Sequence, residues 1–238
     1  MALMAFLIEN APKGATFIDC GAFAGLYSLF ATSIRNDCFA IGLEPSAVTF
    51  GRFVQNIQLN ELHNRILPLH LAAASQERVM SLPHQYGVFT LCPGEALSKT
   101  GAPDHSETVL CMTLDTLIEG KTDFATSRMY EKRFPLNHVA VIKIDVEGAE
   151  LDVLNGAFQL IERFKPVFIC EALNDTAFNH LIGFFQKVGY VAKWVAGERN
   201  IIAATPAAME KIDAEFPVWF SEQSPGQQTI TATEVIKR

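Results

Sequence analysis

The chain has 238 residues, of which 49% are hydrophobic, and it carries a formal net charge of −7. This length suits one large α/β domain, and because no linker divides the chain, we expect a single domain over residues 1–238. The acidic charge, without any run of lysine or arginine, argues against nucleic acid or an anionic membrane as a partner, since both reward clustered positive charge. A small-molecule partner is the favoured expectation, and the oligomeric state stays open.

No stretch approaches the roughly 18 consecutive apolar residues that a membrane span needs. The apolar segment 1–8 lacks the basic start of a secretory signal, so we expect a packed helix there and a cytoplasmic protein. The five cysteines are an odd number and include no C-x-x-C pair, which argues against a disulfide framework and against a thiolate zinc site.

Short β-rich runs alternate with helical apolar patterns along the first third of the chain. This alternation predicts βαβ units, and hence a mostly parallel sheet with helices on both faces. Strands are predicted at 16–21, 38–44 and 66–71, and helices at 26–34 and from Pro45-Ser46 to residue 60.

The pattern changes at about residues 76–137, where short β-like pieces are separated by proline, glycine, histidine and serine. We predict a β-rich insertion there, with strands at 79–82, 87–91 and 108–114. Loops at the carboxyl edge of an α/β sheet commonly recognise the substrate, so the insertion is the expected acceptor pocket; the alternatives are a plain extension of the sheet or an oligomer contact. Its candidate pocket residues are His84, Tyr86, Phe89, His105, Phe124 and Tyr130.

The α/β pattern resumes after the insertion. The domain core therefore covers about residues 16–204, and a C-terminal tail follows over about residues 205–238. The predicted elements are a strand at 138–145, a helix at 149–164, a strand at 166–171, a helix at 175–188 and closing strands at 190–195 and 200–204.

A polar ligand is expected where the first strand turns into a helix, at Asp19-x-Gly21-x-x-x-Gly25. Glycine lets the backbone approach a ligand, and a helix N-terminus offers unpaired N–H groups. Glu44 ends the next strand, where an acid in a nucleotide-binding α/β fold accepts hydrogen bonds from ribose hydroxyls. Tight turns can use glycines for structure alone, but acids at matched strand ends favour a nucleotide-like cofactor.

A dinucleotide-binding fold is the specific competitor. It requires G-x-G-x-x-G, whereas Phe23 and Ala24 leave only Gly21 and Gly25, so the pyrophosphate cradle is incomplete. An NAD-dependent or nucleotide-sugar-binding oxidoreductase is therefore kept as an alternative. A non-catalytic protein that retains the cofactor fold is a second alternative.

Four acids lie close together around the end of a predicted buried strand. Asp145 and Glu147 are expected at the carboxyl edge of the sheet, where they would converge on the cleft. Glu150 and Asp152 are most simply first-turn residues that favour the helix dipole. Asp145 and Glu147 are thus the stronger candidates for chemistry.

In these motifs the chain resembles the FkbM-type methyltransferases, a family within the class I methyltransferase fold. The resemblance covers about residues 16–204 and is most specific in I-K-I-D-V-E-G-A-E, residues 142–150. Phe23 departs from the asparagine that is common in that family's turn, at the place where the methionine moiety is held. The resemblance is also carried by residues 17–28, Glu44-Pro45 with Asn56 and Leu59-Asn60, and Thr113-Leu114-Asp115.

The resemblance implies a Rossmann-like, mostly parallel seven-stranded sheet with S-adenosylmethionine at its carboxyl edge. It also implies methyl transfer, usually to a hydroxyl oxygen of a sugar, polyketide or similar small molecule. By the same resemblance, Asp19, Gly21 and Gly25 would line the amino-acid portion of the cofactor. Glu44 would hold the ribose, and Asp145 would lie nearest the methyl group. The other positions that the resemblance places along the cofactor are Ala22, Phe23, Pro45 and residues 72–75.

An alcohol acceptor must lose its proton during methyl transfer. The candidate bases are Asp145 and Glu147, with His84 and His105 of the insertion as alternatives. A divalent metal could instead acidify the hydroxyl. Because no fixed ligand spacing is visible among the acids, no metal ligands are predicted.

Overall fold

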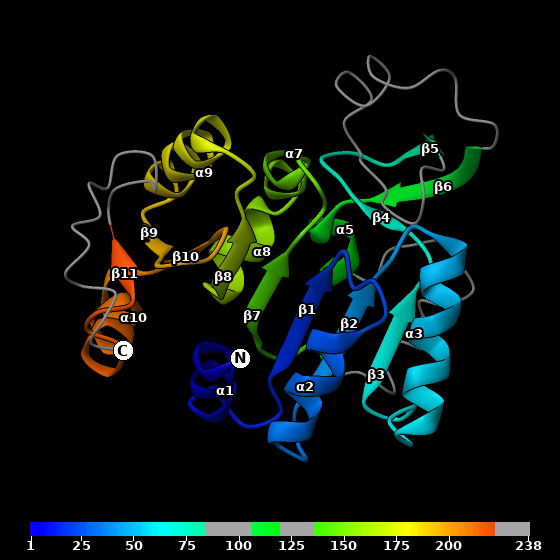
Figure 1. Ribbon diagram of the computed structural model, residues 1–238, viewed down its shortest axis with the longest axis horizontal. Helices are drawn as coiled ribbons and strands as arrows, with labels where there is room; N and C mark the ends of the chain where they lie inside the picture. Colours follow the sequence, from blue (N-terminus) through cyan, green and yellow to red (C-terminus); the bar gives the residue numbers. More distant parts are fainter. Residues whose placement is uncertain (84–105, 120–135, 222–238) are drawn as a thin grey trace.

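The computed structural model describes residues 1–83, 106–119 and 136–221. Within these ranges one sheet contains eight strands in the order β11-β9-β10-β8-β7-β1-β2-β3 (Figure 1). The strand bounds are β1 Thr16–Cys20, β2 Phe39–Leu43, β3 Ile66–Leu69, β7 Val139–Ile144, β8 Val167–Glu171, β9 Val191–Val195, β10 Asn200–Ala204 and β11 Phe220–Ser221.

The sheet confirms the predicted α/β class. β3, β2, β1, β7 and β8 run parallel to one another, and β10 is antiparallel to both β8 and β9. These seven strands form the expected mostly parallel sheet. Strands of such a sheet are buried on both faces, and all five residues of β1 are buried. The eighth strand, β11, adds two residues beside β9.

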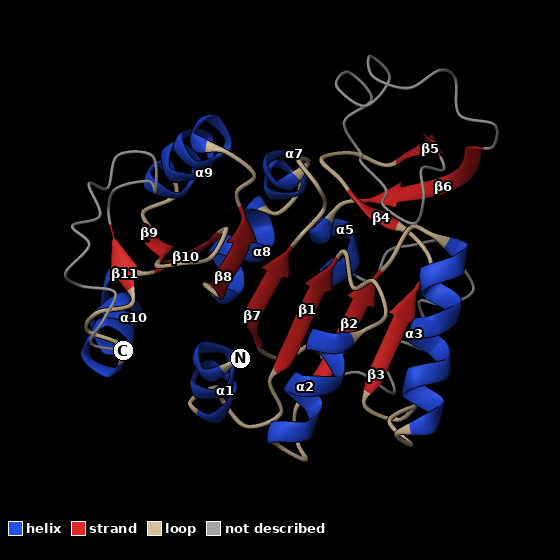
Figure 2. Ribbon diagram, in the orientation of Figure 1, coloured by secondary structure: helices blue, strands red, loops and turns tan. Residues whose placement is uncertain are grey.

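Helices cover both faces of the sheet, as expected (Figure 2). On one face α1, α2, α3 and α10 pack around Phe17 and Val141, and on the other α5, α7, α8 and α9 pack around Ile18, Ile142 and Phe168. Successive side chains of a strand point to opposite faces, which is why Phe17 and Ile18 belong to different layers. In the described ranges, no helix is both long and apolar enough to cross a membrane. The helix bounds are α1 Ala2–Glu9, α2 Leu26–Ile34, α3 Ala47–Leu59, α5 Leu114–Glu119, α7 Glu150–Asn155, α8 Phe158–Phe164, α9 Asp175–Lys187 and α10 Pro206–Glu215.

The single helix predicted over residues 149–164 is wrong, because the chain breaks at Gly156 into α7 and α8. A side chain at Gly156 would place its Cβ 2.3 Å from the carbonyl oxygen of Ala74, so only glycine fits beneath that loop. The Gly156 carbonyl accepts a hydrogen bond from the Asp115 N–H. The Asp115 carboxylate accepts two N–H groups from the first turn of α8. Asp115 therefore caps α8 from outside the helix.

Two strands of the insertion, β5 and β6, form a second sheet with β4, which precedes the insertion; in the described ranges the strand order is β4-β6-β5. This sheet lies beyond the carboxyl ends of β2 and β3 (Figure 1). The strand predicted at 108–114 ends earlier, because the Thr113 hydroxyl accepts the N–H of Thr116 and α5 begins. The predicted strand at 87–91 and the six candidate pocket residues of the insertion lie outside the described residues. The strand bounds are β4 Ala72–Ala73, β5 Arg78–Pro83 and β6 Ser106–Met112.

The segment after residue 204, predicted as a tail, contains regular structure as far as residue 221. Helix α10 begins with Pro206, and the Thr205 side chain accepts the N–H of Ala208. Proline at the first helical position and threonine before it are both typical of a helix start. An ion pair of 2.8 Å between Lys193 and Asp213 joins β9 to α10. This part of the chain therefore belongs to the domain.

Replacing Asp115 with alanine should remove the acceptor for two backbone N–H groups at the start of α8. Loss of such a capping side chain lowers the free energy of unfolding by about 1–2 kcal/mol. Glu162→Ala, at an exposed position of the same helix, should lower it by less than about 0.5 kcal/mol. Urea denaturation measures both values, and equal stability of the two variants would show that Asp115 does not hold the start of α8.

Candidate active site

A cavity of about 300 Å³ opens at the carboxyl ends of β1, β2 and β7. Open α/β sheets bind their ligands at this edge. The walls come from the β1–α2 turn, the end of β2, strand β4 and the turn after β7. Glu147 and the predicted adenine-side residues Ala72 and Ala73 lie on these walls. The predicted cofactor residues that line the cavity are Gly21, Ala22, Phe23, Glu44, Pro45 and Asp145.

The β1–α2 turn depends on two glycines with positive φ angles, Gly21 at 79° and Gly25 at 84°. A Cβ on Gly21 would lie 1.8 Å from the carbonyl oxygen of Asp145, and one on Gly25 would lie 2.0 Å from the Phe53 ring. Phe53 also fills the space that a side chain at Gly42 would need. The glycines thus let the turn pack against β7 and α3, a constraint that adds to the ligand access expected from the sequence.

Phe23 lies at the lip of the cavity with 52% of its surface exposed. Its φ of 53° is in the left-handed region, which favours glycine and asparagine over an aromatic residue. Asparagine, common at this place in the family that the chain resembles, suits that conformation better. The Phe23 N–H donates to Glu44 Oε2 at 2.8 Å. The strained backbone therefore aims a donor at the Glu44 carboxylate, at a conformational cost of about 1–2 kcal/mol.

Glu44 is only 5% exposed and receives three hydrogen bonds from its own chain. Oε1 accepts the Ser46 N–H at 2.9 Å and the Thr49 hydroxyl at 2.7 Å, and Oε2 accepts the Phe23 N–H. An ionised carboxylate offers about four acceptor positions. One position on Oε2 is thus left, so Glu44 can accept one hydrogen bond from a ligand.

Asp19 is fully buried, and in the described part of the chain neither it nor Gly25 lines the cavity. Its Oδ2 accepts the Ser28 N–H at 3.1 Å and the Ser28 hydroxyl at 2.8 Å, which caps α2. Its Oδ1 has no hydrogen-bond partner among the described residues. Burial raises the pKa of Asp19, and Lys143 and Ser28 offset part of the rise. Asp19 therefore acts on the cavity through α2 and through Lys143.

Lys143 is a cavity residue that was not singled out from the sequence. It is 3% exposed, and its Nζ lies 2.7 Å from Asp145 Oδ2 and 4.4 Å from the centre of the Tyr27 ring. Burial lowers the pKa of Lys143, but the carboxylates of Asp19 and Asp145 outweigh burial and raise it, so the side chain stays charged. The sequence did contain a signal for Lys143, because a lysine inside an apolar buried strand needs a polar partner.

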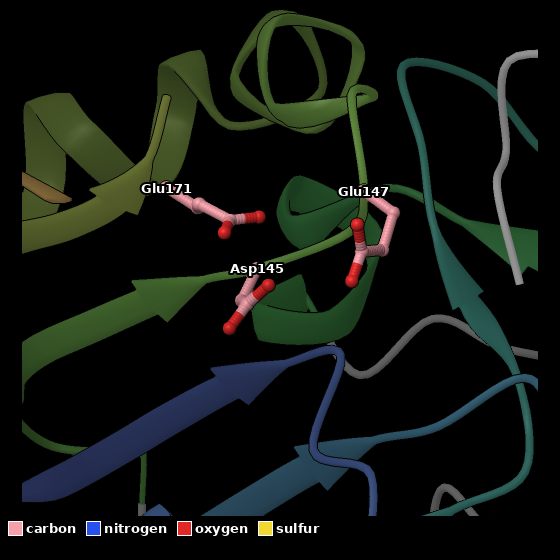
Figure 3. A group of neighbouring side chains, drawn as sticks. All are labelled: Asp145, Glu147 and Glu171. Carbon is pink, nitrogen blue, oxygen red and sulfur yellow. The ribbon is translucent and has the colours of Figure 1, made fainter. Parts of the chain in front are cut away.

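Three carboxylates gather at the ends of β7 and β8: Asp145, Glu147 and Glu171 (Figure 3). One oxygen from each lies within 4.8 Å of the others. Glu147 has a φ of 53°, which turns the chain back at this point, and Gly148 follows at 101°. Burial and the charge of Asp145 raise the pKa of Glu147. The same causes, together with Glu147, raise the pKa of Glu171 to about 7.

Glu150 and Asp152 occupy the first turn of α7, as predicted, and both also bind specific partners. Glu150 is 2% exposed, and its Oε1 accepts the N–H groups of Val146 at 3.2 Å and Gly148 at 3.0 Å. These bonds hold the turn that carries the acidic cluster. Asp152 pairs with Arg78 at 3.1 Å, which joins α7 to β5.

The cluster of Asp145, Glu147 and Glu171 can act in two ways. Three carboxylate oxygens, completed by water, are ligands that suit a divalent cation. Without a cation, neighbouring carboxylates share protons, and a group with a pKa near 7 can take a proton from a hydroxyl at neutral pH. The sequence predicts no metal ligands among these acids, and the absence of a metal remains a prediction.

Two solved structures illustrate the class of protein that this fold defines. The methyltransferase FkbM from Methylobacillus flagellatus KT has a TM-score of 0.55 and 16% identity, covering 80% of this chain and 43% of that chain. A putative caffeoyl-CoA O-methyltransferase from Staphylococcus aureus has a TM-score of 0.51 and 11% identity, covering 86% and 81%. At such identities the fold alone is shared, and it is the class I methyltransferase fold.

Comparison of the sequence with known families identifies the family. The model of the methyltransferase FkbM domain matches residues 19–192, so the chain belongs to the FkbM methyltransferase family. Methyltransferase sdnD of Sordaria araneosa is 28% identical over 163 residues, which are 63% of this chain and 62% of that protein. Methyltransferase 1 of Beauveria bassiana is 24% identical over 175 residues, 70% and 69% of the two chains. The chain thus matches less than two thirds of the Sordaria protein.

The raised pKa of Glu171 should make stability depend on pH. The folded protein holds a proton on Glu171 up to a pH of about 7, whereas the unfolded chain releases it near 4.5. The stabilisation is therefore complete below pH 4.5 and is lost as the pH rises to about 7. Urea midpoints from pH 4 to 8 should show wild type losing stability relative to Glu171→Gln across this window. Parallel pH curves for the two proteins would contradict the assignment.

Proposed function

We propose that the protein uses S-adenosylmethionine to methylate a hydroxyl oxygen of a small molecule, such as a sugar or a polyketide. The observation that carries the proposal is the Glu44 carboxylate, which keeps one acceptor position free beside the turn from Gly21 to Gly25. An acid at the end of the second strand suits a ribose. Family membership favours methyl transfer over the oxidoreductase alternative.

The residues of the cavity fit the three parts of this cofactor. Glu44 would accept a ribose hydroxyl, and Ala72 and Ala73 offer an apolar wall for adenine. Lys143 and Asp145 supply charges for the amino-acid end. When bound, S-adenosylmethionine supplies an electrophilic methyl group on a sulfonium. The chain then has to hold the acceptor in line with that methyl group and keep water away.

The acidic cluster is the proposed source of the base. Asp145 is held by Lys143 and keeps its proposed place beside the methyl group, while Glu147 and Glu171 have raised pKa values. With S-adenosylmethionine bound, Glu147 or Glu171 would accept the O–H proton of the acceptor while the methyl group moves from sulfur to the acceptor oxygen, which would leave a methyl ether and S-adenosylhomocysteine.

Cofactor binding is the first test. Isothermal titration should show S-adenosylmethionine and S-adenosylhomocysteine binding at about micromolar Kd, near −8 kcal/mol, because Glu44 and the β1–α2 turn are preformed. NAD should give no comparable heat, since the turn lacks the third glycine of a pyrophosphate cradle. Binding of NAD in preference to S-adenosylhomocysteine would overturn the proposed function.

Titrations of Glu44 variants test whether this residue binds the ribose. Glu44→Ala should weaken S-adenosylhomocysteine binding about ten- to a hundredfold, because a charge-assisted hydrogen bond is lost. It should also lower stability, since three buried donors lose their acceptor. Thr49→Val removes one of those donors without touching the ligand, and its Kd should change less than about threefold. Equal losses of affinity in both variants would remove Glu44 from the ribose site.

The base is tested with Glu171→Gln and Glu147→Gln, after radiolabelled donor and a panel of sugars and hydroxylated polyketides have identified an acceptor. If Glu171 takes the proton, kcat of wild type rises with pH through about 7. Glu171→Gln should lose that rise and about a hundred- to ten-thousandfold in kcat, with cofactor Kd nearly unchanged.

The control for this assay is Glu162→Gln, which changes an exposed carboxylate on α8 and should leave kcat unaltered. A parallel assay with EDTA separates the base from a cation. Loss of activity that magnesium restores would assign the cluster to a metal. Full activity of both cluster variants in EDTA would exclude both roles and direct attention to His84 and His105.

A further inference from the structure

A buried lysine faces the end of the cavity formed by the β1–α2 turn and β7. Lys143 is 3% exposed yet lines the cavity. An ammonium group carries three N–H donors. Among the described residues one hydrogen bond is made, to Asp145 Oδ2 at 2.7 Å. The Tyr27 ring lies 4.4 Å from Nζ on another side. A cation in this position has donors left for a group inside the cavity.

The start of α2 adds donors at the same end. The nine-residue helix α2 begins at Leu26 with Gly25 as its N-cap. Leu26 and Tyr27 both line the cavity, and in the part of the chain that the structure describes their N–H groups have no acceptor. The N–H of Ser28 is already bound by Asp19. A helix N-terminus carries partial positive charge, so the lysine and the helix favour an anion together.

The neighbouring carboxylates keep Lys143 charged when no anion is bound in the cavity. Asp19 and Asp145 keep Lys143 charged, and neither occupies all its donors. Asp19 Oδ1, which has no hydrogen-bond partner in the described ranges, is an acceptor outside the cavity lining, so Asp19 acts on the anion through the charge of Lys143.

We propose that Lys143 is the residue that binds the α-carboxylate of the cofactor's amino-acid end. This rests on the proposed function. Glu44 holds the ribose on the β2 side of the cavity, and Lys143 with the start of α2 holds the carboxylate on the β7 side. The ion pair between Lys143 and Asp145 places a cation and an anion side by side, which matches an amino-acid zwitterion. Lys143 thereby selects ligands that carry the carboxylate.

The test compares two ligands that differ in this group alone, S-adenosylhomocysteine and its decarboxylated analogue, by isothermal titration. Wild type should bind S-adenosylhomocysteine about ten- to a hundredfold more tightly, as expected for a charge-assisted hydrogen bond. In Lys143→Met the preference should fall to within about threefold. Lys143→Arg keeps the charge and should retain part of the preference.

The outcomes separate this proposal from the one it rests on. If wild type binds neither ligand, both proposals fail. If wild type binds both ligands equally, the proposed function stands and the role of Lys143 is overturned. The role is also overturned if Lys143→Met loses affinity for both ligands by the same factor, because the lysine then supports the fold only.

Removal of Lys143 leaves Asp145 without its partner and can prevent folding. The double variant Lys143→Met/Asp145→Asn removes both charges and supplies a second measurement. It should show the same loss of preference for the carboxylate. A double variant that folds and still prefers S-adenosylhomocysteine by the wild-type factor would overturn the proposal.

Discussion

The close backbone contact between Gly21 and Asp145 is the constraint on which the cavity depends. The Asp145 N–H donates to the Cys20 carbonyl at 2.9 Å, and the Asp145 carbonyl oxygen occupies the space that a side chain at Gly21 would need. This contact joins the ends of β1 and β7. The turn that supports Glu44 and the turn that carries Glu147 therefore keep a fixed separation, and a side chain at Gly21 would push them apart.

The charged groups in and beside the cavity depend on one another for their positions. Asp19 caps α2 and attracts Lys143, Lys143 binds Asp145, and Glu150 holds the turn of Glu147. Removing Asp145, whose side chain is 35% exposed, would leave the ammonium group of the buried Lys143 without its ion-pair partner and destabilise the protein. The groups that shape the site are thus the same groups that stabilise this edge of the sheet.

Local sequence patterns predicted much of this architecture because each pattern lies within one element. Helix α2 begins and ends at the predicted residues, and Glu44 and Asp145 face one cavity. Other features depend on contacts between distant segments. The break at Gly156 follows from the carbonyl of Ala74, and Glu171 joins the site because β8 pairs with β7. No local pattern contains such information, so a single helix was predicted and Glu171 was overlooked.

The Phe53 ring limits which residues are tolerated at two positions, 25 and 42. It fills the space beside Gly25 and Gly42, whose Cβ atoms would lie 2.0 Å and 2.5 Å from it. Gly42 has an ordinary φ, so alanine is tolerable there if residue 53 is smaller than phenylalanine. A smaller residue at position 53 with glycine retained at position 42 would leave a void. Residues 42 and 53 should therefore covary among related chains, with small and large side chains exchanged between them. Gly25 should stay invariant, because its positive φ would strain any replacement.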